Sequence, residues 1–213
     1  IWAMRADGSA PRRISDVGEG VESFGLAPDG RHVYYTTHVH VKDIKSADVH
    51  KDMPKSQARI YDDLMCRHWD YWDEGDYSHI FVAATDGKTL TDARDATATD
   101  ESGMPAAWDT PLAPYFDSDE IAWSPDGTML AYTCKPLTGT EYAQSTDSDI
   151  FVYYVENGAQ QNICKPVVCG KVHYNGEAAK QMPFVGYDKY PVWSPSGTKI
   201  AFRSQRRAGN ESD

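Results

Sequence analysis

The chain has 213 residues, with 21 lysines and arginines against 32 aspartates and glutamates, a formal net charge of −11. So acidic a chain lacks the basic surface that nucleic acids and anionic membranes attract, and we expect neither as a partner. Its longest apolar runs have the length of a strand, whereas a membrane span needs about 20 residues, so none is expected. An aromatic content of 12%, with 16 glycines and 12 prolines, favours an all-β fold rich in turns.

Three segments of the chain repeat one another: 24–36, 121–133 and 192–203. Each reads as a short apolar strand, a Pro-Asp-Gly or Pro-Ser-Gly turn, and a second apolar strand. Proline presets φ at the first turn position, and glycine adopts the left-handed conformation that the turn needs. Each segment therefore predicts an antiparallel hairpin, and their common register indicates an internal repeat.

A second repeat, at 1–8, 79–87 and 149–158, alternates with the first along the chain. Each copy is a strand that ends in Asp-Gly or Asn-Gly, which favour two-residue hairpin turns. Together the two repeats predict a partial β-propeller of four-stranded antiparallel blades, about three blades' worth of strands. A β-sandwich is the alternative, but it does not explain the strict alternation of two hairpin types.

The repeats also predict the boundaries within this single propeller domain. These are strands of a cut blade at 1–20, a complete blade at 21–93, a connection at 94–118, a complete blade at 119–164, a connection at 165–189, and strands of a second cut blade at 190–213.

An insertion at 38–78 interrupts the first complete blade, where a short loop would be enough. Its apolar side chains recur at intervals of three and four residues: Ile60, Tyr61, Leu64, Met65, Trp69 and Trp72. This spacing predicts a helix over residues 53–72 that docks through one face. Ser56 is placed to cap the start of this helix and Gly75 to end it.

The Trp-Ser-Pro-Asp-Gly turn, followed by Leu-Ala-Tyr or Ile-Ala-Phe, resembles the WD40-like repeat of bacterial propellers and of the prolyl oligopeptidase family. The stretches 53–65, 67–70, 78–81 and 207–213 further resemble bacterial dipeptidyl peptidases of the acylaminoacyl-peptidase branch. The resemblance implies that the propeller gates access to the active site of a serine exopeptidase. That enzyme would release dipeptides or acyl-amino acids from peptide substrates, in the periplasm or outside the cell.

The catalytic residues implied by this resemblance belong to a C-terminal α/β-hydrolase domain. Their nucleophile would lie in Gly-x-Ser-x-Gly, and no glycine here is followed two positions later by serine. We therefore expect no catalytic residue in this chain. The rival interpretation is a non-enzymatic periplasmic propeller scaffold or a glycan-binding module, which has less need of the insertion.

Two pairs of residues are candidates for a binding site. His38 and His40 have a spacing that metals can use, but no third ligand is visible nearby, so we predict no metal and no cofactor. Asp73 and Glu74 follow the predicted helix, and related dipeptidyl peptidases hold the protonated amino terminus of the substrate with an acidic pair on the propeller. The alternative for Asp73 and Glu74 is a solvated helix end.

Cys164 and Cys169, with four residues between them, could pair across a loop, or all four cysteines could remain thiols. The chain opens without methionine inside an apparent strand, so we expect it to be part of a longer protein. Strand pairs at both ends are complementary in type. A head-to-tail homodimer that exchanges them is one expectation, and an open arc is the other.

The missing nucleophile motif generates the first testable prediction: the purified chain does not cleave dipeptidyl or acyl-aminoacyl anilides. Without a nucleophile elbow, no histidine can activate a serine in the required geometry. Release of the chromogenic amine, measured with and without a serine-directed fluorophosphonate, tests this. Turnover that the fluorophosphonate blocks would contradict it.

Overall fold

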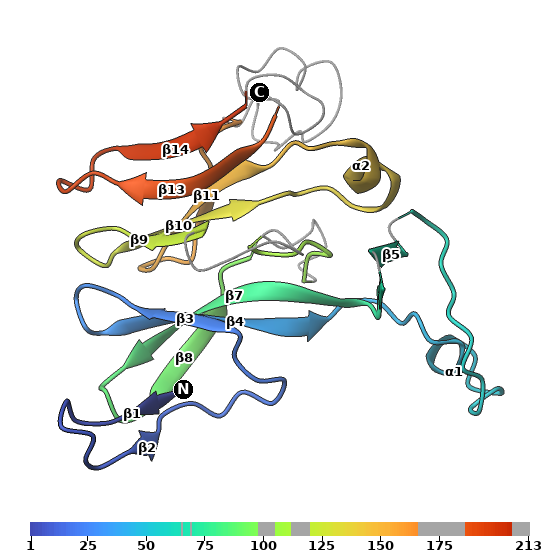
Figure 1. Cartoon of the computed structure of the whole chain (residues 1–213), viewed down its shortest axis with the longest axis horizontal. Helices are drawn as coiled ribbons and strands as arrows, with labels where there is room; N and C mark the ends of the chain where they lie inside the picture. Colours follow the sequence, from blue (N-terminus) through green and yellow to red (C-terminus); the bar gives the residue numbers. More distant parts are fainter. Residues whose placement is uncertain (65, 69, 98–104, 112–119, 166–185, 206–213) are drawn as a thin grey trace.

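Antiparallel strands dominate the computed structural model, which describes residues 1–64, 66–68, 70–97, 105–111, 120–165 and 186–205. Two four-stranded sheets and three strand pairs make up the described chain, and none of these sheets is closed (Figure 1). The prediction of a mostly β, antiparallel fold is confirmed, whereas the propeller arrangement stays a prediction. In the described part, no helix is long and apolar enough to cross a membrane.

The first sheet has the order β3-β4-β7-β8, so its strands are neighbours in chain order apart from the insertion. They are β3 (Ser23–Leu26), β4 (His32–His40), β7 (Asp76–Thr85) and β8 (Leu90–Asp95). The longest pairing joins β4 to β7, from His32 opposite Ala84 to His40 opposite Asp76. The insertion leaves the sheet at the end of this long pair and returns to it there.

The second sheet repeats this pattern with the order β12-β11-β10-β9. Its strands are β9 (Ile121–Trp123), β10 (Met129–Cys134), β11 (Asp149–Tyr154) and β12 (Gln160–Asn162), and α2 (Gly139–Gln144) lies between β10 and β11. Two further pairs flank the sheets in Figure 1: β1 (Trp2–Ala3) with β2 (Arg12–Arg13), and β13 (Asp188–Trp193) with β14 (Ile200–Ser204).

The three proline-containing turns have the same hydrogen bonds. In each, the glycine N–H donates to the carbonyl three residues earlier at 2.9 Å: Gly30 to Ala27, Gly127 to Ser124 and Gly197 to Ser194. The three glycines have φ between +69° and +72°, the left-handed region that the sequence predicted for them. The repeated sequence therefore produces a repeated turn.

Both faces of the second sheet are buried. Alternate residues of a strand point to opposite faces, so each of its strands contributes side chains to two cores. Leu130 and Tyr132 pack with Phe151 in a core shared with the first sheet. Ala131 and Val152 belong to a separate core that includes side chains of β13 and β14. This two-sided burial explains the continuous apolar run of β11, since neither face needs polar residues.

Tryptophan side chains connect successive sheets in the same manner. The indole N–H of Trp123 on β9 donates to the Gly25 carbonyl on β3 at 3.1 Å. The indole N–H of Trp193 on β13 donates to the Ala122 carbonyl on β9 at 3.0 Å. Both donors precede the Ser-Pro turn of their repeat, so one sequence position makes the same contact twice.

The insertion differs from its prediction, because the described residues of 53–72 form no helix. The described part of the insertion has one helical turn, α1 (Ser46–Val49), and the strand pair β5 (Arg67–His68) and β6 (Tyr71–Trp72). Two of the aromatic side chains that suggested a helix instead stack on each other: the ring centroids of Tyr61 and Trp72 lie 6.1 Å apart, and the rings are nearly parallel. Trp72 is 48% exposed, and the predicted contacts of Met65 and Trp69 lie outside the described residues.

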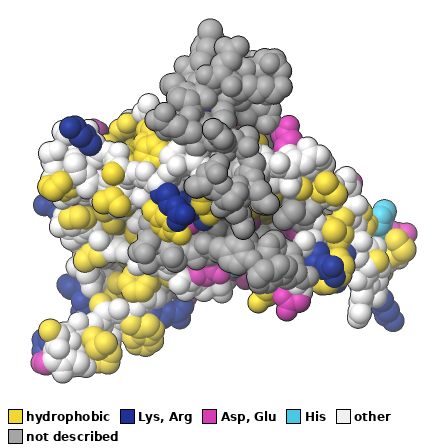
Figure 2. Space-filling model, turned by 45° about the horizontal axis from the view of Figure 1, so that its top comes forward, with side chains coloured by type: hydrophobic (Ala, Val, Ile, Leu, Met, Phe, Trp, Pro, Cys, Tyr) yellow, Lys and Arg dark blue, Asp and Glu magenta, His cyan; other side chains and the backbone are white. Residues whose placement is uncertain are grey.

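The face drawn in Figure 2 shows apolar, basic and acidic side chains interspersed over the described residues. The large apolar side chains at the centre of the fold are instead sealed between the sheets. Leu130 and Tyr132 are both 0% exposed, whereas Leu26 on β3 is 60% exposed. Stability should therefore depend on the contacts between sheets rather than on surface groups.

This contrast predicts that Leu130→Ala lowers the free energy of unfolding by about 2–5 kcal/mol, because it leaves a cavity between two packed sheets. Leu26→Ala is the matched control, with an expected loss below about 1 kcal/mol. Urea denaturation followed by tryptophan fluorescence measures both. Equal losses for the two variants would show that the sheets do not pack as described.

Candidate functional site

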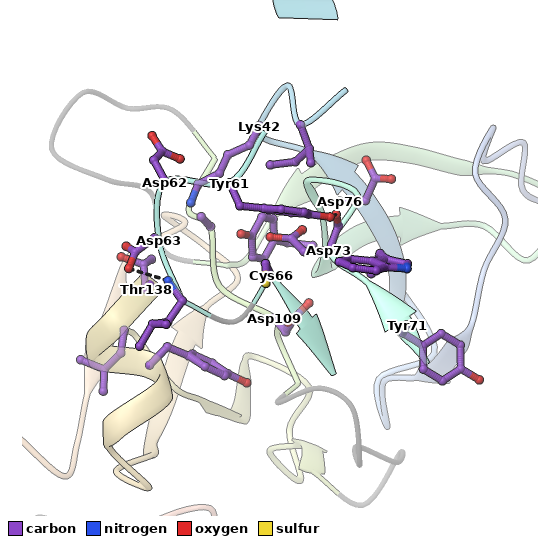
Figure 3. Close-up of a pocket in the computed structure, with 18 of the residues that line it drawn as sticks. Lys42, Tyr61, Asp62, Asp63, Cys66, Tyr71, Asp73, Asp76, Asp109 and Thr138 are labelled. Carbon is purple, nitrogen blue, oxygen red and sulfur yellow. Dashed lines mark hydrogen bonds between the residues drawn. The ribbon is translucent and has the colours of Figure 1, made fainter. Parts of the chain in front are cut away.

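A cavity of about 280 Å³ lies where the insertion meets α2 and the segment 105–111 (Figure 3). Its walls come from parts of the chain that are far apart in sequence. Its polar and aromatic lining includes His38, Lys42, Tyr61, Asp73, Tyr77, Asp109 and Tyr142. The volume is slightly below the usual range for ligand pockets, about 300–1,000 Å³. It therefore suits a small group or the end of a chain.

The cavity is acidic. Among the described lining residues are five aspartates, namely Asp62, Asp63, Asp73, Asp76 and Asp109, against one lysine, Lys42, and one histidine, His38. In Figure 3, Asp73 and Asp109 lie toward the middle, with Tyr61 beside them, whereas Tyr71 points away. Concentrated carboxylates in a recess attract cations, so the expected ligand is positively charged.

Asp73 is held in place by its own backbone neighbours. Its Oδ1 accepts a hydrogen bond from Gly75 N at 2.7 Å, and its carbonyl accepts one from the Tyr61 hydroxyl at 2.7 Å. Its Oδ2 has no hydrogen-bond partner among the described residues and is available to a ligand. Gly75 has φ +83°, and a Cβ there would lie 1.9 Å from the Lys42 carbonyl oxygen. Only glycine fits this turn, which fixes Asp73 beside the cavity.

Glu74 follows Asp73 in the sequence, but the two side chains have different environments. Arg59 donates to Glu74 Oε1 through Nε at 3.0 Å and also through Nη2, and Lys45 Nζ lies 3.7 Å from Oε2. The Arg59 guanidinium holds the pKa of Glu74 below its usual range. Glu74 does not line the cavity. The structure therefore separates the predicted pair, with Asp73 at the cavity and Glu74 in an ion pair.

Asp109 is the second carboxylate at the middle of the cavity, and the sequence analysis missed it. Burial raises its pKa to about 6, and the negative charge of Asp73 acts in the same direction. One hydrogen bond, from Ser78 N to Asp109 Oδ1 at 3.0 Å, partly offsets this rise. Asp109 lies in a proline-rich connection without a motif, so no local sequence signal marks it.

Aromatic residues and a docking contact complete the walls. Burial raises the pKa of the Tyr77 and Tyr142 hydroxyls, which stay neutral at physiological pH.

The Thr140 hydroxyl donates a hydrogen bond to Asp63 Oδ1 at 2.7 Å and so connects α2 to the insertion. Gly139 has φ +55°, and a Cβ there would collide with the Asp63 carboxylate. The insertion thus packs against α2 at a position where any larger residue would be strained.

His38 and His40, the two candidate metal ligands of the sequence, lie on β4 beside carboxylates. His38 Nδ1 lies 3.5 Å from Glu22 Oε1. His40 lies between Asp76, 2.7 Å from its Nδ1, and Asp43, 3.1 Å from its Nε2. The hydrogen bond with Asp76, followed by that with Asp43, raises the pKa of His40. Each histidine therefore has an acidic partner on the surface.

Comparisons with known proteins give relatives along nearly the whole chain, although no family model matches it. Dipeptidyl-peptidase 5 of Porphyromonas gingivalis is 36% identical over 199 residues, covering 91% of this chain and 25% of that protein. Dipeptidyl-peptidase 5 of Porphyromonas endodontalis is 30% identical over 213 residues, covering 100% and 27%. The chain is similar to a quarter of a dipeptidyl-peptidase 5.

Fungal proteins give weaker matches. Dipeptidyl-peptidase 5 of Aspergillus fumigatus is 28% identical over 165 residues, covering 75% of this chain and 21% of that protein. Among solved structures, an oligogalacturonate lyase in complex with manganese covers 95% of this chain and 37% of its own. Its TM-score of 0.43 and 15% identity are too low to carry an argument. The chain spans about a quarter of the length of the curated relatives it matches.

The raised pKa of Asp109 predicts a pH-dependent cost to stability. A carboxyl whose pKa is higher in the folded state destabilises that state increasingly as pH rises from about 4 to 6, after which the cost is constant. Asp109→Asn should therefore raise the free energy of unfolding at pH 7 by on the order of 2 kcal/mol and leave it unchanged near pH 4.

Denaturation midpoints at several pH values between 4 and 8 measure this effect. Asp62→Asn, at an exposed carboxylate of the same cavity, is the control, and its difference from the parent chain should stay small throughout. A pH-independent effect of Asp109→Asn would contradict the assignment of a raised pKa to Asp109.

Proposed function

We propose that this chain is part of the substrate-gating propeller of a serine exopeptidase like dipeptidyl-peptidase 5, and that its cavity receives the protonated amino terminus of the substrate. The observation that carries the proposal is the position of Asp73 and Asp109 at one small acidic cavity. Cleavage belongs to a C-terminal α/β-hydrolase domain that this chain does not contain. The chain contributes recognition and access, in a periplasmic or secreted enzyme.

An enzyme that releases dipeptides must bind the amino terminus of its substrate at a fixed distance from the bond that is cleaved. A terminal ammonium offers three donors, and two carboxylates facing one recess supply the matching acceptors and negative charge. Burial raises the pKa of Asp109, and repulsion from the negative charge of Asp73 adds a smaller rise. A bound ammonium would relieve this repulsion, so the free site is built to gain energy from a cation.

Small size and aromatic walls supply the second part of recognition. The cavity holds only the end of a peptide, so an internal segment, which has no free amine, does not satisfy the carboxylates. The backbone hydrogen bonds of Asp73 keep it in position before the ligand arrives. Preorganisation of this kind reduces the entropic cost of binding.

The propeller arrangement is supported by the way successive sheets contact each other. Trp123 and Trp193 make equivalent hydrogen bonds to the preceding sheet, which one repeated displacement between neighbouring sheets would produce. Four-stranded antiparallel units stacked in chain order are typical of propeller blades. The concentration of negative charge in the cavity favours a cationic group, such as an ammonium, over the neutral hydroxyls of a glycan.

This proposal predicts that the chain binds a dipeptide amide with a free amino terminus and discriminates against the N-acetylated form. A charge-assisted hydrogen bond is worth about 1.5–3 kcal/mol, so acetylation should weaken binding at least about tenfold. Asp73→Asn should weaken binding of the free amine by a similar factor. Isothermal titration calorimetry or chemical-shift titration measures the dissociation constants.

Glu74→Gln is the matched control, since it neutralises the adjacent carboxylate, which lies outside the cavity. Its affinity for the free amine should stay within about twofold of that of the parent chain. Equal affinity for the free and acetylated peptides would overturn the proposal. Binding of oligosaccharides in place of peptides would favour the glycan-binding alternative.

A further inference from the structure

A second acidic cluster lies buried at the contact between the second sheet and β13, and none of its members lines the cavity. It consists of Asp149 on β11, Cys164 just after β12, and Asp188 on β13. One ligand atom of each lies within 4.8 Å of the others. Asp149 and Asp188 are 0% exposed and Cys164 is 1% exposed. Such closeness of two carboxylates and a thiol requires an explanation.

The backbone around the cluster is fixed. Asp188 N donates to the Ser148 carbonyl at 3.1 Å, and the Ser148 hydroxyl donates to the Asp188 carbonyl at 3.1 Å. The side-chain amide of Asn162 donates to Asp149 Oδ2 at 2.8 Å, while its oxygen accepts from Cys164 N at 3.0 Å. The three side chains are therefore held toward one another before any ligand binds.

Several oxygens of this cluster lack partners. Both carboxylate oxygens of Asp188 and Oδ1 of Asp149 are buried and accept no hydrogen bond from the described residues. Burial raises the pKa of Asp188, and the nearby Ser204 hydroxyl and Cys164 thiol offset this rise only in part. A buried carboxylate without donors is costly, and native proteins rarely leave one unsatisfied.

Charge at this position is also unbalanced. Among the described residues, Lys165 is the cation of the cluster: it pairs with Asp147, and its Nζ lies 2.9 Å from Asp149 Oδ2. Ionised Asp147, Asp149 and Asp188 against one ammonium leave two negative charges away from water. A divalent cation would reduce this negative charge and give a partner to the oxygens that accept no hydrogen bond.

We propose that Asp149, Cys164 and Asp188 bind a divalent cation of the zinc class and thereby cross-link the second sheet to β13. A thiolate beside two carboxylates favours Zn²⁺ over Ca²⁺ or Mg²⁺, which prefer oxygen ligands alone. The cation displaces the thiol proton of Cys164, which leaves to solvent, and a sulfur–metal bond forms. The metal stabilises the contact between sheets without taking part in peptide cleavage.

The test uses the chain purified under reducing conditions and freed of metal with a chelator. Co²⁺ should bind one per chain and give the near-ultraviolet absorption of a thiolate–cobalt bond. Zn²⁺ at about a hundred times its dissociation constant should raise the Tm by about 5–10 °C. Both readouts are independent of the acidic cavity and of any peptidase activity.

Three variants locate the site. Cys164→Ser should abolish the cobalt absorption, and Asp188→Asn should weaken cobalt binding at least about tenfold. Asp188→Asn also removes a buried charge, so it is expected to fold, as far-ultraviolet circular dichroism can verify. Cys66→Ser is the control, since this thiol lies in the insertion, and it should keep the full absorption.

Absence of a Tm shift with Zn²⁺ in the parent chain would overturn the proposal. So would cobalt absorption that persists in Cys164→Ser, or unchanged affinity in Asp188→Asn. A disulfide between Cys164 and Cys169 in protein purified without reductant, found by mass spectrometry, would also contradict it. Cys164 is a free thiol in the structure, and Cys169 lies outside the described residues.

Discussion

Burial of the second sheet on both faces is the constraint on which the rest of the structure depends. Leu130 and Tyr132 must be covered on one side and Ala131 and Val152 on the other. The first sheet supplies one cover and the β13–β14 pair the other. Because the strands are apolar on both faces, neither cover can be removed without exposing a core. The resulting stack gives the cavity and the buried acidic cluster their fixed walls.

Local signals predicted the hairpins, and they failed where long-range contacts decide the structure. Proline and glycine determine a turn within four residues, so the three repeated turns followed from the sequence. The predicted helix at 53–72 was wrong because the aromatic spacing is used by Tyr61 and Trp72 to stack on each other. Several side chains of that segment stay exposed, so no buried face selects a helix there.

The candidate site also combines residues that the sequence pointed to with residues that only long-range contacts bring together. Asp73 was identified from the sequence because carboxylates next to each other are visible in a single chain. Its partner at the cavity is Asp109, which a distant connection brings into place, while the neighbouring Glu74 is drawn away by Arg59. Adjacency in the sequence pointed to two carboxylates, of which Asp73 lines the cavity and Glu74 does not, and their role in binding stays a prediction. Only the packing of the insertion against α2 decides which carboxylates share a space.

The two acidic sites handle like-charge repulsion differently, and the difference follows from their access to water. At the cavity, burial raises the pKa of Asp109, but a cation that enters the cavity can relieve its repulsion with Asp73. At the junction with β13, Asp149 and Asp188 are sealed from water, so screening is lost. The proposed divalent cation would supply a permanent countercharge there. We therefore expect a ligand to exchange at the cavity and a metal to stay bound at the junction with β13.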